Sequence, residues 1–170
     1  MVITSDIQLK GTAWNKAITS LENIFKTRTN YSIFLLSTAI GIMYDKQIVS
    51  PDENGEENSY VPRSVLHQYA EDLDFLFQAA ILTTKTENLD EEDRLSLAFG
   101  DEKKSNFERM KFLLKFANFG VTKLVDKIGG NTLETMENIK EFLASSMEGT
   151  NFDIFEINDD DIEIEESELS

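Results

Sequence analysis

The side chains best suited to chemistry are few, and they do not form a catalytic set. His67 is the only histidine, and no candidate nucleophile accompanies it, so we interpret it as a helical surface residue. Cysteine is absent, which excludes a thiolate nucleophile, a disulfide and a zinc site with cysteine ligands. The acidic run DENGEEN at 52–58 fails the EF-hand spacing, because taking Gly55 as the sixth position puts Ser50 first and Val61 twelfth. We therefore predict a non-enzymatic protein without a metal ion or cofactor.

A basic segment offers a binding surface instead. Residues 103–128 carry seven Lys and Arg against two acids in an otherwise acidic chain. At helical spacing, three of these lysines fall on one edge: Lys104, Lys111 and Lys115. Phe112 and Phe119 lie nearer to this lysine edge than to the predicted core stripe. The stripe consists of Met110, Leu114, Ala117, Val121, Leu124 and Ile128. Two interpretations stay open. The lysines either balance acids elsewhere in the fold or contact a partner, a nucleic-acid backbone or the protein's own C-terminal segment.

The C-terminal segment, residues 149–170, is strongly acidic and is called the tail below. It holds nine acids and no base, so the remaining chain carries −7 of the net charge of −16. Such a charge argues against nonspecific nucleic-acid binding, which needs Lys and Arg. Apolar residues recur at or near alternate positions in the tail, which predicts either disorder or a strand formed on a partner. The candidate contacts in the tail are Phe152, Phe155, Asp159, Asp160 and Asp161.

Apolar spacing predicts a mainly α fold with one helical domain, residues 1–148, of about five helices. The expected helices cover 12–26, 31–44, Pro62 to about 81, 106–128 and 133–148, with a further short helix over 91–99 capped by Asp90. The segment 31–44 is apolar on nearly every side, which is typical of a central, buried helix. It is too short to span a bilayer, and the N-terminus lacks a signal-peptide pattern, so we expect a soluble, cytoplasmic protein.

Local signals refine the ends of these elements. Ser105 with Glu108, and Asn131 with Glu134, are candidate capping boxes at two helix starts. In the acidic loop 45–62, the sequence favours a short β-hairpin over 47–61 and irregular structure equally.

The stretch LLKFANFG at 113–120 places a glycine inside the most helical segment, at a cost of roughly 1 kcal/mol relative to alanine. On a helical wheel Asn118 points away from the core stripe and Gly120 borders it. We expect Gly120 to admit a close neighbour, with the small residues Ala39 and Gly41 as the candidate, and Phe119 to be an exposed or interface aromatic.

Three segments resemble a known family: IFKTRTNYSIFLLSTAIGI at 24–42, QAAILTTKTENLDEED at 78–93 and FERMKFLLKFANFGVTKLVDKI at 107–128. Together they resemble the small accessory proteins encoded beside bacterial DNA phosphorothioation (Dnd-type) genes, loosely over about residues 20–128. The resemblance implies a small helical component of an anti-phage or DNA-modification system that acts through partners or DNA. It carries over no catalytic residues.

These observations lead to a first hypothesis and two alternatives. The first is an accessory subunit of a bacterial defence complex that binds a larger protein through the 106–128 helix and the tail. The alternatives are an acidic DNA mimic that occupies a partner's basic groove, and a DNA binder that uses the lysine edge. No membrane contact is expected, and a homo-oligomer stays open.

Overall fold

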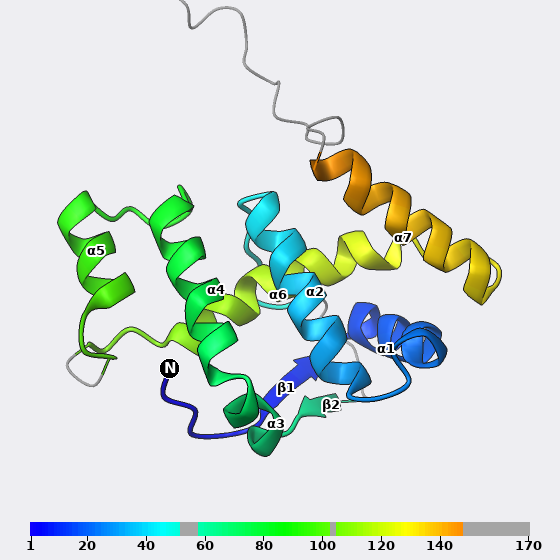
Figure 1. Ribbon diagram of the computed structural model, residues 1–170, viewed down its shortest axis with the longest axis horizontal. Coiled ribbons are helices and arrows are strands. Elements are labelled where there is room, and N and C mark those ends of the chain that lie inside the picture. Colours follow the sequence, from blue (N-terminus) through cyan, green and yellow to red (C-terminus); the bar gives the residue numbers. More distant parts are fainter. Residues whose placement is uncertain (52–57, 103–104, 148–170) are drawn as a thin grey trace, which may run out of the picture.

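The protein is mainly helical, as predicted. The computed structural model describes residues 1–51, 58–102 and 105–147. In chain order its elements are β1 (Ile7–Lys10), α1 (Thr12–Phe25), α2 (Thr29–Met43), β2 (Asn58–Val61), α3 (Arg63–Gln68), α4 (Ala70–Thr83), α5 (Glu91–Phe99), α6 (Arg109–Val125) and α7 (Thr132–Met147). Helices α2 and α6 cross at the centre, with α4 and α5 on one side and α1 and α7 on the other (Figure 1).

The two strands form a small antiparallel sheet in which Ile7 of β1 lies opposite Val61 of β2. The alternative of a hairpin over 47–61 is wrong. Its second arm is strand β2, but its first arm is not a strand, because the Ile48 N–H donates to the Lys115 carbonyl at 3.1 Å and ties that segment to α6. The strand that pairs with β2 is therefore the N-terminal one, for which we had predicted no element.

The helix predicted from Pro62 to about 81 is two helices, α3 and α4, which meet at Tyr69. The backbone of Tyr69 leaves the helical region (φ −116°, ψ 25°), and its ring stacks on Tyr31 of α2 at 4.5 Å between ring centres. Arg28 lies over the same ring at 5.2 Å. The break coincides with this tertiary contact with α2, which no local sequence signal near Tyr69 indicates.

Two of the three predicted caps form. The Asp90 carboxylate accepts from the Asp93 N–H at 2.8 Å, and the Asn131 side chain accepts from the Glu134 N–H at 3.0 Å. The return bond of the predicted box is shifted by one residue, because the Glu134 carboxylate accepts from the Gly130 N–H at 2.8 Å. The capping box at the start of α6 is wrong, because the Ser105 hydroxyl accepts instead from the Phe107 N–H and the helix begins after Glu108.

The crossing of α2 and α6 is the most extensive contact between any two elements. A Cβ atom on Gly120 would overlap the Ser37 carbonyl oxygen and lie 2.7 Å from its carbon. On the other helix, a Cβ on Gly41 would overlap the Phe116 carbonyl oxygen and lie 2.6 Å from its carbon. The two backbones therefore touch, which confirms the predicted role of Gly120 and its pairing with the segment around Gly41.

Phenylalanines fill much of the core beside this crossing. The Phe112 ring packs against Phe77, Phe107 and Phe116, with ring centres 5.1 to 5.5 Å apart. Across the described ranges, no helix combines the length and apolar character that a membrane crossing requires.

Candidate functional site

The lysine edge of α6 is engaged within the protein. The Lys111 ammonium lies 2.7 Å from the Glu108 carboxylate, and the Lys115 ammonium lies 3.7 Å from Glu87. Lys104 falls outside the described residues. Surface pairs of this kind contribute little to stability, at most about 1 kcal/mol. They nevertheless agree with the interpretation in which these lysines balance acids of the same fold.

The two aromatics predicted beside the lysine edge are not free on the surface. Phe112 is 2 % exposed, so a partner cannot reach it without opening the core. Phe119 is half-buried against Tyr44, at 5.8 Å between ring centres, and the Lys123 ammonium lies 5.8 Å from the Phe119 ring. The tail candidates Phe152, Phe155, Asp159, Asp160 and Asp161 lie outside the described residues.

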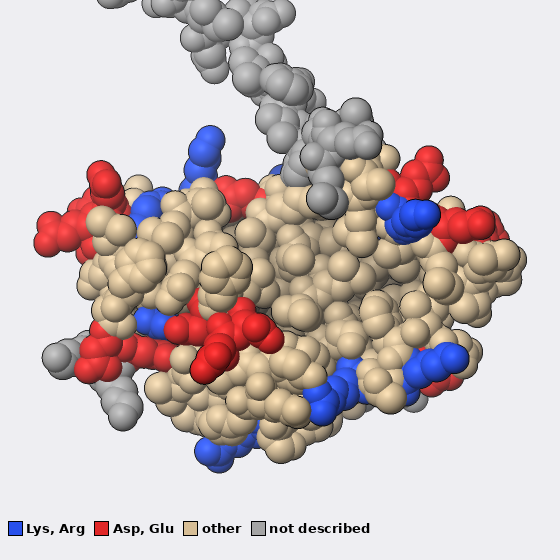
Figure 2. Space-filling view, in the orientation of Figure 1, with Lys and Arg blue, Asp and Glu red and all other residues tan. Residues whose placement is uncertain are grey.

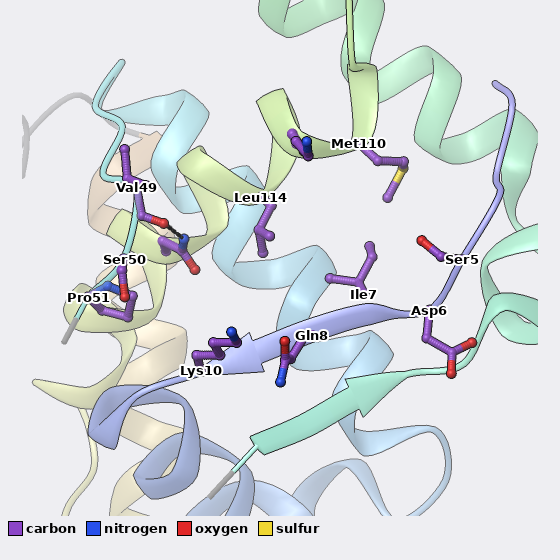
Figure 3. A pocket seen from close by; sticks show the side chains of 12 residues that line it. Ser5, Asp6, Ile7, Gln8, Lys10, Val49, Ser50, Pro51, Met110 and Leu114 are labelled. Carbon is purple, nitrogen blue, oxygen red and sulfur yellow. Dashed lines mark hydrogen bonds between the residues drawn. The ribbon is translucent and has the colours of Figure 1, made fainter. Parts of the chain in front are cut away.

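Asn118 does not point away from the core as predicted; it is 5 % exposed and holds three segments together. Its side-chain oxygen accepts from the Trp14 indole N–H at 2.9 Å. Its amide donates to the Val49 carbonyl at 2.7 Å, the bond drawn as a dashed line in Figure 3. A buried indole N–H needs an acceptor, and Asn118 supplies it. The residue is a structural link between α1, α6 and the segment after α2.

A surface cavity of about 590 Å³ lies beside this link, between β1, α6 and residues 49–51 (Figure 3). Its apolar lining consists of Ile7, Val49, Pro51, Met110 and Leu114. The predicted core stripe is thus displaced at this end of α6, because the last two of these side chains are only half-buried. Asp6, also in the lining, already accepts from the Arg63 N–H at 2.7 Å.

The groove between α2 and α7 has a different character. It has a volume of about 690 Å³ and is lined by Ile24, Phe25, Ser32, Leu35, Leu36, Ala39, Met136, Ile139, Lys140 and Leu143. Ser32 and Lys140 are its only polar residues. We call it the α2–α7 groove. The surface over α2 is uncharged and is hollowed toward α7, with basic side chains over α7 and where α2 begins (Figure 2).

The sequence of α2 explains why this groove exists. The helix is apolar on nearly every side, and it packs one side on α6 and another on α1. Among the described residues, no helix covers its third side, with Leu35, Leu36 and Ala39. Helix α7 instead packs on α1 and stacks Phe142 against Tyr44, with ring centres 6.5 Å apart. The prediction of a buried central helix is therefore correct for two sides of α2 and wrong for the third.

At its α1 end the groove meets the Tyr31–Tyr69 stack. Tyr31 is 6 % exposed, and its hydroxyl has no hydrogen-bond partner among the described residues. Burial raises the pKa of Tyr31 to about 12, and the nearby Asp72 carboxylate and Tyr69 act in the same direction against the smaller opposing effect of Arg28.

The remaining chemistry-bearing residues do not converge. His67 is exposed on α3, where its Nε2 accepts from the Arg63 guanidinium at 3.1 Å. Within residues 1–51, 58–102 and 105–147, no three acidic or histidine side chains gather closely enough to hold a metal ion. Most of the acidic loop 52–58 falls outside these ranges.

Sequence reasoning placed the binding surface on α6 and missed the α2–α7 groove. A signal was present, because an all-round apolar α2 has more apolar surface than two neighbours can cover. What the pattern alone could not supply is which side of α2 stays open. No family model, curated protein or solved structure matches this chain.

Proposed function

We propose that this protein is a non-catalytic binding subunit that holds an apolar segment of a larger protein in the α2–α7 groove. The observation that carries this proposal is the groove's composition: eight of its ten lining residues are apolar, and they come from three helices. Contiguous exposed apolar surface on a folded protein commonly marks a docking site. Burying one large apolar side chain in such a groove contributes about 1.5–3 kcal/mol, so a few suffice for specific binding.

The shape of the site agrees with recognition of a peptide segment. Helices α2 and α7 each wall the groove over about two turns, and an amphipathic helix or an apolar strand laid between them would present side chains to both walls. The resemblance to Dnd-type accessory proteins adds a finer hypothesis, in which the larger protein belongs to a bacterial defence or DNA-modification complex.

An acidic surface supports a second candidate function, the DNA mimic. The first turn of α5 exposes Glu91, Glu92 and Asp93, and the first turn of α4 exposes Glu71 and Asp72. Acidic side chains gather over the α4–α5 side of the molecule (Figure 2). With the tail, they would present a negative surface to a partner's basic groove.

Capture experiments with paired variants separate the two functions. Ala39→Glu and Met136→Glu place charge in the α2–α7 groove at exposed positions, so the core is left intact. Phe75→Glu, at a side chain 72 % exposed on α4, is the matched control outside the groove. Trp14 fluorescence and urea unfolding verify that each variant folds.

We expect the wild type and Phe75→Glu to capture a protein from cells of the native source. We expect neither groove variant to capture it. Capture that survives both groove variants overturns it. The DNA mimic is favoured if capture is lost in the double variant Glu91→Lys with Glu92→Lys and if the wild type also loses capture at moderate salt.

A further inference from the structure

The chain continues directly from one wall of the α2–α7 groove. Helix α7 ends at Met147, and 23 residues follow it in the sequence. Among these, residues 152–157 read FDIFEI, in which four apolar side chains alternate with or adjoin two acids. We propose that residues 152–157 occupy the α2–α7 groove of the same molecule and shield it until a partner displaces them. This inference rests on the groove being the docking surface proposed above.

Chain length permits the contact. The α7 residues that line the groove, Leu143, Ile139 and Met136, lie 4, 8 and 11 residues before Met147, or about 6, 12 and 17 Å along a helix. Residues 152 and 157 are five and ten residues past it, and an extended chain of that length reaches about 17 and 34 Å. If the tail reverses direction at 148–151, residues 152–157 alone extend back about 20 Å, which still covers the groove as far as Met136.

The side-chain chemistry matches as well. Phe152, Ile154, Phe155 and Ile157 would meet Leu35, Leu36, Ile139 and Leu143, the larger apolar side chains of the walls. Lys140 lies in the lining, and the exposed Lys26 and Arg28 lie in the turn between α1 and α2, next to the lining residue Phe25. The tail carries nine acids and no base, so in the groove it would be held by attraction to these cations as well as by burial.

The lysine edge of α6 is a poorer receptor for the same segment. Its described lysines already pair with Glu108 and Glu87, and Phe112 beside them is buried. The α2–α7 groove has open apolar walls, and one of those walls leads directly into the tail.

Disulfide trapping tests the proposal in the full chain, because the protein has no native cysteine. Ala39→Cys places a thiol in the groove, and Ile154→Cys places one in the tail. Diamide at high protein dilution takes up the two thiol hydrogens and leaves an intramolecular disulfide, which is seen as a faster band on a non-reducing gel. Ala144→Cys with Ile154→Cys is the control, since Ala144 is exposed on α7, outside the groove lining and closer to the tail.

We expect the 39–154 pair to close at least about tenfold faster than the 144–154 pair, although the latter is nearer along the chain. Phe152→Asp with Phe155→Asp should abolish that preference. Equal rates, or a faster 144–154 pair, overturn the proposal, and a disulfide between two molecules assigns the groove to another copy's tail and also overturns it. No partner protein takes part in the trapping experiment. A negative result there refutes only the placement of the tail, and the capture experiment with Ala39→Glu still tests the proposed function separately.

Discussion

Substitution of Gly120 gives the sharpest test of how the centre of the molecule is built. A Cβ at this position would lie 2.7 Å from the Ser37 carbonyl carbon, whereas ordinary contacts begin at 3.4 Å. The atoms that this Cβ would meet are backbone atoms of Ser37 and Gly41, so no side chain can rotate away to make room. Helices α2 and α6 must separate by at least roughly 0.7 Å to relieve this contact, and by more to clear the Ser37 carbonyl oxygen, which is closer still. A gap of 0.5–1 Å already forfeits about a quarter to a half of the dispersion energy of the contacts involved.

The competing term is helix propensity, which favours alanine over glycine by roughly 1 kcal/mol. Overpacking in a rigid core costs about 1–3 kcal/mol, and more where backbone must move. We therefore expect Gly120→Ala to lower the free energy of unfolding by about 1–2 kcal/mol after the gain in helix propensity is subtracted. Gly120→Leu should lower it by about 3–5 kcal/mol. Gly41→Ala should behave like Gly120→Ala, because the same overlap occurs against Phe116.

Urea unfolding followed by Trp14 fluorescence measures these changes, since Trp14 is the only tryptophan and is fully buried. Ala39→Leu is the control on α2, at an exposed position in the groove, and should change stability by less than about 1 kcal/mol. If Gly120→Ala is as stable as the wild type, or gains the 1 kcal/mol or so of helix propensity, the two backbones are not in contact as described.

Three further predictions concern buried polar groups. Asn118→Ala leaves the Trp14 indole N–H without an acceptor, so urea unfolding should show a loss of about 2–3 kcal/mol. Arg94 donates to four backbone carbonyls at the end of α4 and in the connection to α5, so Arg94→Lys should make thermolysin cut that connection several-fold faster. Tyr31 keeps its proton to about pH 12 when folded but loses it near pH 10 when unfolded, so its stabilising effect is complete below pH 10 and is lost between pH 10 and 12. Tyr31→Phe should remove that component, about 1–3 kcal/mol, when urea unfolding is compared at pH 9 and pH 11.5.

Each of these has a clear contrary result. An unchanged urea midpoint for Asn118→Ala means that Trp14 finds another acceptor. Equal thermolysin rates for Arg94→Lys and the wild type mean that the connection is held by other contacts. Parallel loss of stability with pH in Tyr31→Phe and the wild type means that the unpaired hydroxyl does not control the alkaline response.

Local patterns predicted much of the fold. Helix α1 follows from the 4-3-4 spacing of Trp14, Ile18, Leu21 and Phe25, and helix α5 begins at the expected Asp90 cap. The close approach at Gly120 was also predictable, because a glycine in a strongly helical segment beside a stripe of apolar residues has few other structural explanations.

The misses have one physical origin, which is contact between segments far apart in sequence. The acceptor role of Asn118 depends on Trp14, 104 residues away, and a helical wheel of α6 contains no trace of it. Phe112 seemed to flank a single apolar stripe, but α6 is central and is covered on more than one side, so the residues that lie off the stripe are buried too. The α2–α7 groove arises because the described helices leave one side of α2 uncovered, and only the three-dimensional arrangement reveals which side that is.

The crossing of α2 and α6 also sets when this protein can fold as it is made. Helix α2 is complete at Met43, but its main neighbour α6 is complete only at Val125, 82 residues later. At the usual synthesis rate of about 5–20 residues per second, α2 waits roughly 4–16 s with the side that packs on α6 unmatched. During that interval this apolar side is exposed surface of the kind that promotes aggregation. The first half of the protein, made alone, lacks the helix that would complete its core.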